Sequence, residues 1–220
     1  NKLDYDTWAQ MGNTGWSYDD VLPFFKKMEN YQGNTSELRG EEGPLKVSEV
    51  SDRNPIYDAI FKSGEVNNIP FNKDYNGEEQ EGLGYTQTTI YKGERMSAEV
   101  AYLRPIKSRK NLTIITNSLV TKLLFEKKKC IGVEVKNKNK ISTFMMSKEV
   151  ILSGGAINSP QILELSGIGN SSILKKNGIE PLHHLVGVGE NLRDHIAPRI
   201  IYRVNKEGVS YNDKAGGINL

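Results

Sequence analysis

Three consecutive residues, Ser153, Gly154 and Gly155, are the strongest candidates for contact with a ligand. Ser153 ends an apolar run over 149–153 that is typical of a strand, and the two glycines lead into a helix-like stretch. Ser159 suits a helix N-cap and Pro160 suits the first helical position, where a missing N–H costs nothing. Glycine lets backbone approach a ligand closely, and the free N–H groups of a helix start favour an anion. The sequence therefore predicts a strand, a glycine turn that could hold an anionic ligand, and a helix beginning within a residue or two of Pro160.

Other polar residues make weaker candidates for chemistry. The pair 183–184 is two adjacent histidines, which point to opposite faces of a strand and would bind a metal only with further ligands. The pair 194–195 places Asp before His, but neighbours in sequence are not thereby hydrogen-bonded. Ser153 and Ser166 lack the Gly-x-Ser-x-Gly context of a hydrolase nucleophile. We predict no catalytic residue and no metal ligand within the chain.

A second glycine-containing string, over 187–192, resembles a dinucleotide fingerprint only superficially. Leu192 stands where the third glycine belongs, and only a short apolar run precedes the string. We predict no dinucleotide site at this string.

The composition indicates a soluble globular protein with one domain or two small ones. Of 220 residues, 37% are hydrophobic and 25% charged, and 29 basic against 27 acidic side chains leave a net charge of +2. This near balance gives no case for nucleic acid or a membrane surface as partner. No apolar stretch approaches the ~18 residues of a membrane-spanning helix. Cys130 is the only cysteine, which excludes an internal disulfide and a multi-cysteine metal site.

Hydrophobic periodicity and turn residues predict a mixed set of elements. Helices are expected over 18–30 with Ser17 or Asp19 as the cap, from Asn54 onward, and over 95–106. Strands are expected over 44–48 and 83–91. Four short strands with polar turns between them follow, over 112–116, 119–126, 131–136 and 142–147.

The fifteen residues 155–169 resemble the second sequence signature of the glucose-methanol-choline (GMC) family of FAD-dependent oxidoreductases. Every restricted position fits: Gly155, Ala156, Ser159, Pro160, Ile162, Leu163, Ser166, Gly167, Ile168 and Gly169. The flanking segments 93–97, 101–105, 109–114 and 185–195 also resemble the family. The opening segments 5–8, 15–18 and 21–26 resemble the insect glucose dehydrogenase branch in particular. The resemblance covers nearly all of the chain, and we therefore expect a member of this family.

The resemblance implies an α/β (α+β mixed) fold with two domains, both incomplete in this chain. Residues 95–198 would belong to a Rossmann-like FAD-binding domain with a β-meander inserted at about 112–147. Residues 1–94 would belong mainly to a substrate domain built on an antiparallel sheet, to which 199–220 would return. The family's first Gly-x-Gly-x-x-Gly unit is not found, so the chain is expected to be an internal piece of a longer enzyme.

The resemblance also implies a cofactor, FAD, and residues that contact it. Ser153, Gly154 and Gly155 would approach the pyrophosphate or ribose of FAD, although the family more often has Ala at position 154. The alternative is a tight turn without a ligand. Val120 matches a position whose backbone contacts the adenine, and the alternative is a plain core residue of the meander. Gln87, Thr88 and Thr89 lie on the expected substrate sheet, but the sequence does not fix which of them faces the flavin.

The implied activity is oxidation of an alcohol or sugar hydroxyl, with hydride transfer to the flavin and oxygen or a quinone as acceptor. The catalytic His base of the family is expected beyond Leu220. Two alternatives stay open: a non-enzymatic secreted paralogue that acts as a scaffold or binding protein, and another flavoprotein class with an NAD(P)H donor. Three Asn-x-Ser/Thr sequons, at Asn34, Asn111 and Asn170, permit secretion, and together with the insect branch they favour an extracellular protein.

Overall fold

The computed structural model describes residues 1–34, 36–51 and 53–210, which form two compact units. One unit contains Asn1–Leu112 together with the residues from Ile201 onward, and the other contains Thr113–Ile200. The predicted assignment of 1–94, 95–198 and 199–220 to a substrate domain, an FAD-binding domain and a returning segment stays a prediction. The part of that segment over 211–220 lies outside the described residues.

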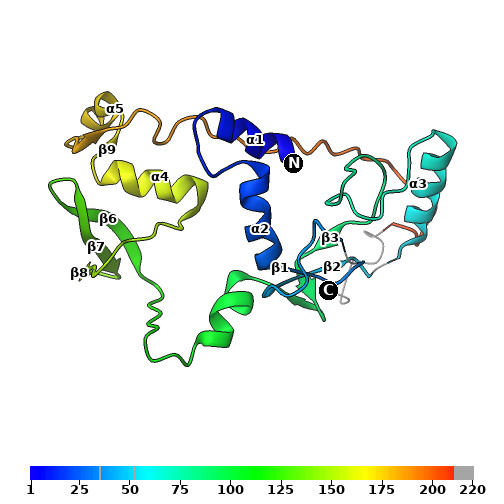
Figure 1. The fold of residues 1–220 in the computed structure, drawn as a ribbon, viewed down its shortest axis with the longest axis horizontal. Coiled ribbons are helices and arrows are strands. Elements are labelled where there is room, and N and C mark those ends of the chain that lie inside the picture. The colour runs from blue at the N-terminus through cyan, green and yellow to red at the C-terminus, as the bar shows by residue number, and fades with distance from the viewer. Residues whose placement is uncertain (35, 52, 211–220) are drawn as a thin grey trace. The chain divides into compact units, whose positions relative to one another are not determined.

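The first unit opens with two helices (Figure 1). Short polar side chains cap their N-terminal ends. Helix α1 spans Lys2–Gln10 and α2 spans Tyr18–Met28. The Ser17 hydroxyl accepts from the N–H of Asp20 at 3.3 Å, and the Asp20 carboxylate accepts from the N–H of Ser17 at 3.1 Å. This reciprocal capping fixes the start of α2. Of the two caps predicted from sequence, Ser17 and Asp19, the structure shows Ser17.

Helix α3, Pro55–Val66, has a similar start. The Asn54 side chain accepts from the N–H of Ile56 at 3.0 Å, and Pro55 occupies the first turn. The buried Asn54 amide also donates to the carbonyl of Val209 at 3.0 Å, so the cap ties α3 to the last described segment. The helix predicted from Asn54 onward is confirmed.

The sheet of the first unit is mixed. Strand β1, Glu29–Tyr31, runs parallel to β2, Leu45–Glu49, and β2 pairs antiparallel with β3, Gln87–Thr88. The sequence predicted an antiparallel sheet. This is corrected to a mixed sheet, in which only the β2–β3 pairing is antiparallel. The single strand predicted over 83–91 is also corrected, because β4, Ile90–Tyr91, leaves the β2 ladder and forms a hairpin with β5, Glu94–Arg95.

The helix predicted over 95–106 is shorter and irregular. It consists of a π-helical turn, Glu99–Leu103, and a 3₁₀ turn, Arg104–Ile106. The N–H of Arg104 bonds the carbonyl of Glu99, five residues earlier, and Pro105 has no N–H with which to continue an α-helical ladder. The proline thus explains why a regular helix does not form.

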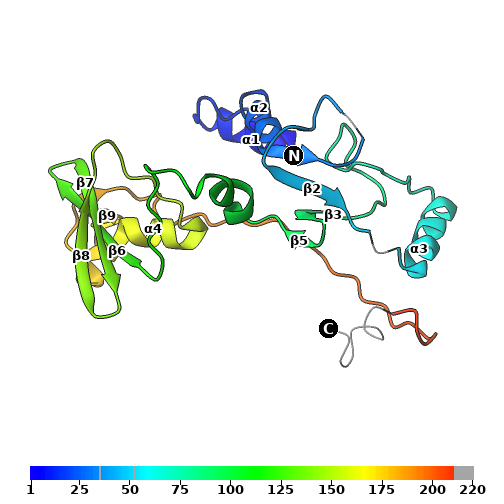
Figure 2. The same cartoon turned by 90° about the horizontal axis from the view of Figure 1, so that it is seen from below.

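The second unit is built on an antiparallel meander, with α4 next to β6 in both views (Figures 1 and 2). Its strands are β6, Leu119–Glu126, β7, Lys129–Asn137, and β8, Lys140–Met145. The predicted meander is confirmed with three strands in place of four. The predicted run 112–116 has no ladder partner among the described strands.

Helix α4, Gly155–Leu165, packs on the meander through its C-terminal end. The N–H of Leu123 in β6 donates to the Ser166 hydroxyl at 2.8 Å. Leu123 and Val135 are buried on the same side of the sheet. The unit is completed by β9, Ile168–Gly169, α5, Ser171–Lys176, and β10, His183–His184, where β9 and β10 pair in parallel.

Two predictions about the start of α4 are wrong. The helix begins at Gly155, five residues before Pro160, and Ser159 is not its N-cap. Ser159 lies in the second turn of α4, and its hydroxyl accepts from the N–H of Gly154 at 3.0 Å. This bond holds the glycine turn against the helix. The run 149–153 forms no strand, because none of the described strands pairs with it, and the Ile151 side chain is 77% exposed.

Among the described residues, no helix combines the length and apolar composition that crossing a lipid bilayer requires.

Candidate functional site

The glycine turn before α4 has a conformation that only glycine adopts readily. Gly155 has a φ of +85°, and a Cβ built on it meets no atom within 4 Å, so the space beside it is open. Gly154 is crowded instead. A Cβ there would lie 3.1 Å from the Cβ of Asn158 and 3.2 Å from the N of Ser159. Backbone is therefore accessible at Gly155, while Gly154 lets the turn fold back on the helix.

The start of α4 also offers hydrogen-bond donors. The first N–H groups of any α-helix have no partner within the helix, and the helix dipole adds partial positive charge there. No acidic side chain lies in the first turn of α4. Open space, free N–H groups and the absence of a competing carboxylate fit the diphosphate of a dinucleotide such as FAD.

Val120 lies on β6, half-buried and opposite Val135 of β7. The ladder shifts register between Val120 and Lys122, which marks a β-bulge. Strand β6 is at one edge of the three-stranded sheet, so part of its backbone faces away from the ladder. This position suits a backbone contact with a planar ring, and the predicted adenine contact stays a prediction.

Among the described residues, no hydrogen bond or ion pair joins Val120 to the glycine turn. Strand β6 is joined to the C-terminal end of α4 by the bond from Leu123 to Ser166. Gly154 and Gly155 lie at the other end of this eleven-residue helix, about 16 Å along its axis. A ligand that contacted both would have to be extended, as a dinucleotide is.

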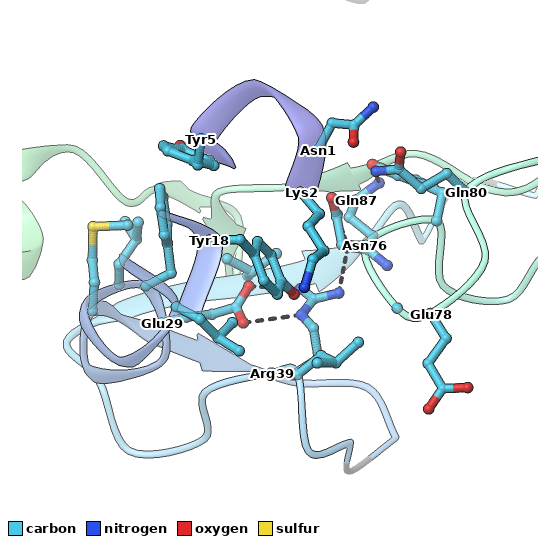
Figure 3. A pocket seen from close by; sticks show the side chains of 18 of the residues that line it. Asn1, Lys2, Tyr5, Tyr18, Glu29, Arg39, Asn76, Glu78, Gln80 and Gln87 are labelled. Carbon is cyan, nitrogen blue, oxygen red and sulfur yellow. Dashed lines mark hydrogen bonds and ion pairs between the residues drawn. The ribbon is translucent and has the colours of Figure 1, made fainter. Parts of the chain in front are cut away.

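The first unit contains a pocket of about 700 Å³ over its mixed sheet (Figure 3). Helices α1 and α2 contribute Tyr5, Tyr18 and Phe25, and the loop after Asp74 contributes Asn76 and further polar side chains. Aromatic rings with a few amide and carboxylate groups suit a small polar or cationic organic ligand. The three residues that sequence could not orient, Gln87, Thr88 and Thr89, all line this pocket.

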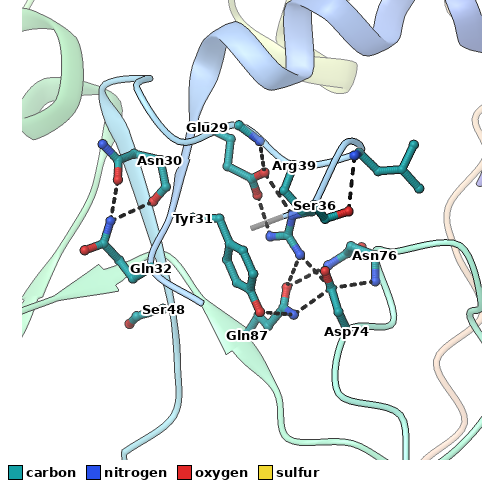
Figure 4. Close-up of polar contacts among 12 residues, drawn as sticks. Glu29, Asn30, Tyr31, Gln32, Ser36, Arg39, Ser48, Asp74, Asn76 and Gln87 are labelled. Atoms are coloured by element: carbon teal, nitrogen blue, oxygen red, sulfur yellow. Dashed lines mark hydrogen bonds and ion pairs between the residues drawn. The ribbon is translucent and has the colours of Figure 1, made fainter. Parts of the chain in front are cut away.

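A buried arginine organises the floor of that pocket (Figure 4). The side chain of Arg39 is 2% exposed. Its guanidinium forms a two-pronged ion pair with Glu29, with Nη2–Oε1 at 2.6 Å and Nε–Oε2 at 2.9 Å. Nη1 pairs with Asp74 at 2.6 Å, and the Cζ lies 3.7 Å from the centre of the Tyr31 ring. One cation thus joins β1 to two loops.

Gln87 extends this network to β3. Its side-chain oxygen accepts from Arg39 at 3.0 Å and from Asn76 at 2.9 Å. Its side-chain nitrogen donates to Asp74 at 2.9 Å and to the Tyr31 hydroxyl at 3.2 Å. With every polar atom of its amide engaged, Gln87 is held in a single orientation in the pocket wall.

Burial and the charges of neighbouring carboxylates have opposite effects on the pKa of Arg39, whereas burial and the charge of Asp74 act in the same direction on the pKa of Tyr31. Burial alone would lower the pKa of Arg39, but the hydrogen bond and charge of Glu29, with the charge of Asp74, raise it above its ordinary value. Burial, and then the Asp74 carboxylate, raise the pKa of the Tyr31 hydroxyl above 10.0. Arg39 therefore stays a cation and Tyr31 a neutral phenol at neutral pH.

Sequence reasoning missed Arg39 altogether. It lies in a polar, glycine-containing stretch that reads as a loop, and no local pattern distinguishes its side chain from a solvated one. The network depends on residues up to 48 positions away, which only the fold brings together.

The histidines do not form a metal site. Nδ1 of His184 lies 2.9 Å from the Ser171 hydroxyl on an exposed surface. The N–H of His195 donates to the Asp194 carboxylate at 2.8 Å. Among the residues that the structure describes, no group of three or more His, Cys, Asp or Glu side chains could hold a metal ion.

A family model described as GMC oxidoreductase matches residues 1–197, which is most of the chain. The chain belongs to the GMC oxidoreductase family. It is 45% identical over 193 residues to "Choline dehydrogenase, mitochondrial" of Homo sapiens, covering 88% of this chain and 32% of that protein. It is 43% identical over 213 residues to an oxygen-dependent choline dehydrogenase of Staphylococcus aureus, covering 96% of this chain and 37% of that protein.

Among solved structures, the GMC chain is similar to an FAD-dependent oxidoreductase from Chaetomium thermophilum. The TM-score is 0.81 at 31% identity, with 88% of this chain and 36% of the other covered. The mixed α/β fold is thereby confirmed, and so is FAD as the cofactor of the family. The chain spans about a third of the length of the curated relatives it matches.

The comparisons correct the finer placement within the family. The opening segments had indicated the insect glucose dehydrogenase branch, whereas the similar curated relatives are choline dehydrogenases. The GMC family model matches residues 1–197 and so spans the segments 5–8 and 15–18, which therefore do not by themselves assign the chain to the insect branch.

Proposed function

We propose that the protein containing this chain oxidises a choline-like alcohol in an FAD-dependent reaction. The observation that carries the proposal is the 45% identity to human choline dehydrogenase over 88% of this chain. Identity at this level favours the interpretation that the two proteins act on the same class of substrate, and do not merely have the same fold. The aromatic lining of the pocket in the first unit adds support, because aromatic faces attract quaternary ammonium groups.

The residues of this chain have a binding role in this proposal. The N–H groups at the start of α4 would donate to the FAD diphosphate, with Gly155 leaving room for the approach. The backbone of Val120 would contact the adenine, and Ser153 and Gly154 would shape the turn. FAD, when bound, supplies the acceptor of the hydride that leaves the alcohol carbon. The acceptor that reoxidises the flavin is proposed to be oxygen or a quinone.

A secreted scaffold without activity is the alternative function, and it predicts that no alcohol reduces the flavin. An extracellular location, which the three sequons permit, stays a prediction. The sequon residue Asn170 caps α5 by accepting from the N–H of Ser172 at 3.0 Å, so this amide already has a structural task.

The cofactor role of the glycine turn can be tested with two matched substitutions in the full protein. Gly155→Val and Gly178→Val both place a branched residue at a positive φ, +85° and +72°, where a Cβ meets no atom within 4 Å. Both should cost about 1–2 kcal/mol of backbone strain. Only Gly155→Val should also lower the FAD content of the purified protein, because only its side chain would stand in the ligand's path.

The measurement is the ratio of flavin to protein after gel filtration, with circular dichroism as the check on folding. Equal flavin content in the two folded variants would contradict the assignment of the turn, whatever the substrate proves to be.

A further inference from the structure

The charge of the chain is concentrated on the meander. Residues 119–145 contain seven lysines and two glutamates, a formal charge of +5, whereas the rest of the chain carries −3 against a total of +2. The near balance of the whole sequence therefore conceals a strongly basic element. Lys127, Lys128 and Lys129 surround the β6–β7 turn, and Lys136, Lys138 and Lys140 surround the β7–β8 turn.

The outward face of the meander also carries exposed apolar side chains. Register places Leu119, Lys136 and Ile141 in one row across the sheet, and Met145 beside Gly132 in another. Alternation along each strand puts both rows on the face opposite the buried Leu123 and Val135. Leu119, Ile141 and Met145 are 66%, 61% and 65% exposed.

Little negative charge opposes the lysines on this face. Glu134 lies in the row between the two apolar ones, where its carboxylate is engaged by the Thr121 hydroxyl at 2.7 Å and by Lys122 at 3.5 Å. The hydrogen bond from Thr121, and the nearby charge of Lys122, lower the pKa of Glu134. The free ammonium groups at both ends of the sheet therefore outnumber the carboxylates.

We propose that this outward face of β6–β8 docks on an anionic lipid surface. Aliphatic side chains standing on a flat sheet can enter the headgroup region of a bilayer, while lysines at the rim pair with lipid phosphates and carboxylates. An acidic protein would use the same lysines, but the three exposed aliphatic side chains among them favour the lipid, whose headgroup region can accept apolar groups beside the phosphates. The inference is independent of the proposed activity, since it uses no residue of the cofactor turn.

Vesicle flotation of the full protein tests the proposal. Vesicles of phosphatidylcholine mixed with phosphatidylserine should carry the protein, those of phosphatidylcholine alone should not, and added salt should weaken binding. Lys136→Glu combined with Lys140→Glu should reduce the bound fraction about tenfold or more. The matched control, Lys175→Glu with Lys176→Glu on exposed α5, makes the same charge change and should bind like the parent protein.

A second pair of variants separates the apolar contribution from charge. Ile141→Thr with Met145→Thr keeps strand-forming residues at both positions and should lower binding to the mixed vesicles without changing its salt dependence. Circular dichroism confirms that each variant is folded. Absence of vesicle binding, equal binding to neutral vesicles, equal loss in the α5 control, or binding to polyglutamate in place of vesicles would each overturn the proposal.

Discussion

Arg39 illustrates how one side chain can organise a wall of a pocket. A guanidinium offers five N–H donors in a fixed fork, and here the donors are divided among Glu29, Asp74 and Gln87, with its face against Tyr31. A lysine could supply the charge but not this geometry. The arginine also neutralises Glu29 and Asp74. Without it, both carboxylates would be partly buried with no cation beside them.

Arg39→Met should therefore destabilise the protein by about 2–4 kcal/mol, because the two carboxylates lose their buried cation. The estimate lies below the range for fully buried pairs, since Glu29 and Asp74 are 19% and 22% exposed. The free energy of unfolding, from urea titration, is the measurement.

The control for this substitution is Arg104→Met. Arg104 also pairs with two carboxylates, Glu94 at 2.8 Å and Glu99 at 3.1 Å, but all three side chains are about half exposed. Its loss should cost less than about 1 kcal/mol. Equal losses for the two arginines would show that burial does not determine the strength of the Arg39 network.

Tyr31 should make the stability of the folded protein depend on pH in the alkaline range. Its pKa is raised, first by burial and then by Asp74, so the folded state disfavours the phenolate that the unfolded state forms near pH 10.0. The stabilising contribution is complete below that pH and is lost as pH rises through the higher folded pKa. The unfolding free energy of the parent protein should fall more steeply above pH 10 than that of Tyr31→Phe. Parallel pH profiles would contradict this account.

At the scale of elements, sequence predicted best where the determinant is local. The capping residues Ser17 and Asn54 lie within three positions of the N–H groups they bind, so the helices they start were found from sequence. The Ser159-Pro160 pair gave a wrong prediction, because both residues lie inside α4 and not at its start. Ser159 bonds backward to Gly154, and the helix extends through a position that proline usually avoids.

Strands were harder to predict, because a strand exists only with a partner. The meander pairs with itself through two-residue turns and was found, whereas 149–153 has no partner among the described strands and is not a strand here. The turns need positive φ at Lys127 and Lys138, 55° and 51°, which sequence alone did not indicate for lysine.

The Ser166 hydroxyl links α4 to the meander by a hydrogen bond. Ser166 accepts from the N–H of Leu123 at 2.8 Å and donates to the carbonyl of Ile162. Ser166→Ala should cost about 1–2 kcal/mol, because the N–H of the buried Leu123 loses its acceptor. Ser171→Ala, whose hydroxyl contacts only the exposed His184 side chain, should change stability by no more than about 0.5 kcal/mol.

Faster hydrogen exchange at the Leu123 amide in Ser166→Ala would locate the loss at this contact. An unchanged exchange rate at Leu123, with stability equal to that of Ser171→Ala, would show that the hydroxyl does not hold α4 on the sheet.

At the scale of the whole molecule, the family could be identified from sequence because its signature is a string of restricted positions at fixed spacing. The branch could not be identified from short motifs, and agreement over 88% of the chain with choline dehydrogenases corrected it. The Arg39 network needed the fold, since it unites residues up to 48 positions apart in the sequence. The basic outward face of the meander needed the strand register, which places Leu119, Lys136 and Ile141 in one row.

The most direct test of the central claim is anaerobic reduction of the flavin in the full protein by candidate alcohols. We predict that the purified protein contains FAD and that choline bleaches its visible absorbance, whereas glucose at the same concentration leaves the oxidised spectrum unchanged. Bleaching by glucose with no response to choline would contradict the proposed substrate class. Stoichiometric FAD that no alcohol reduces would favour the scaffold function, and a protein without bound flavin would contradict the account of the cofactor site.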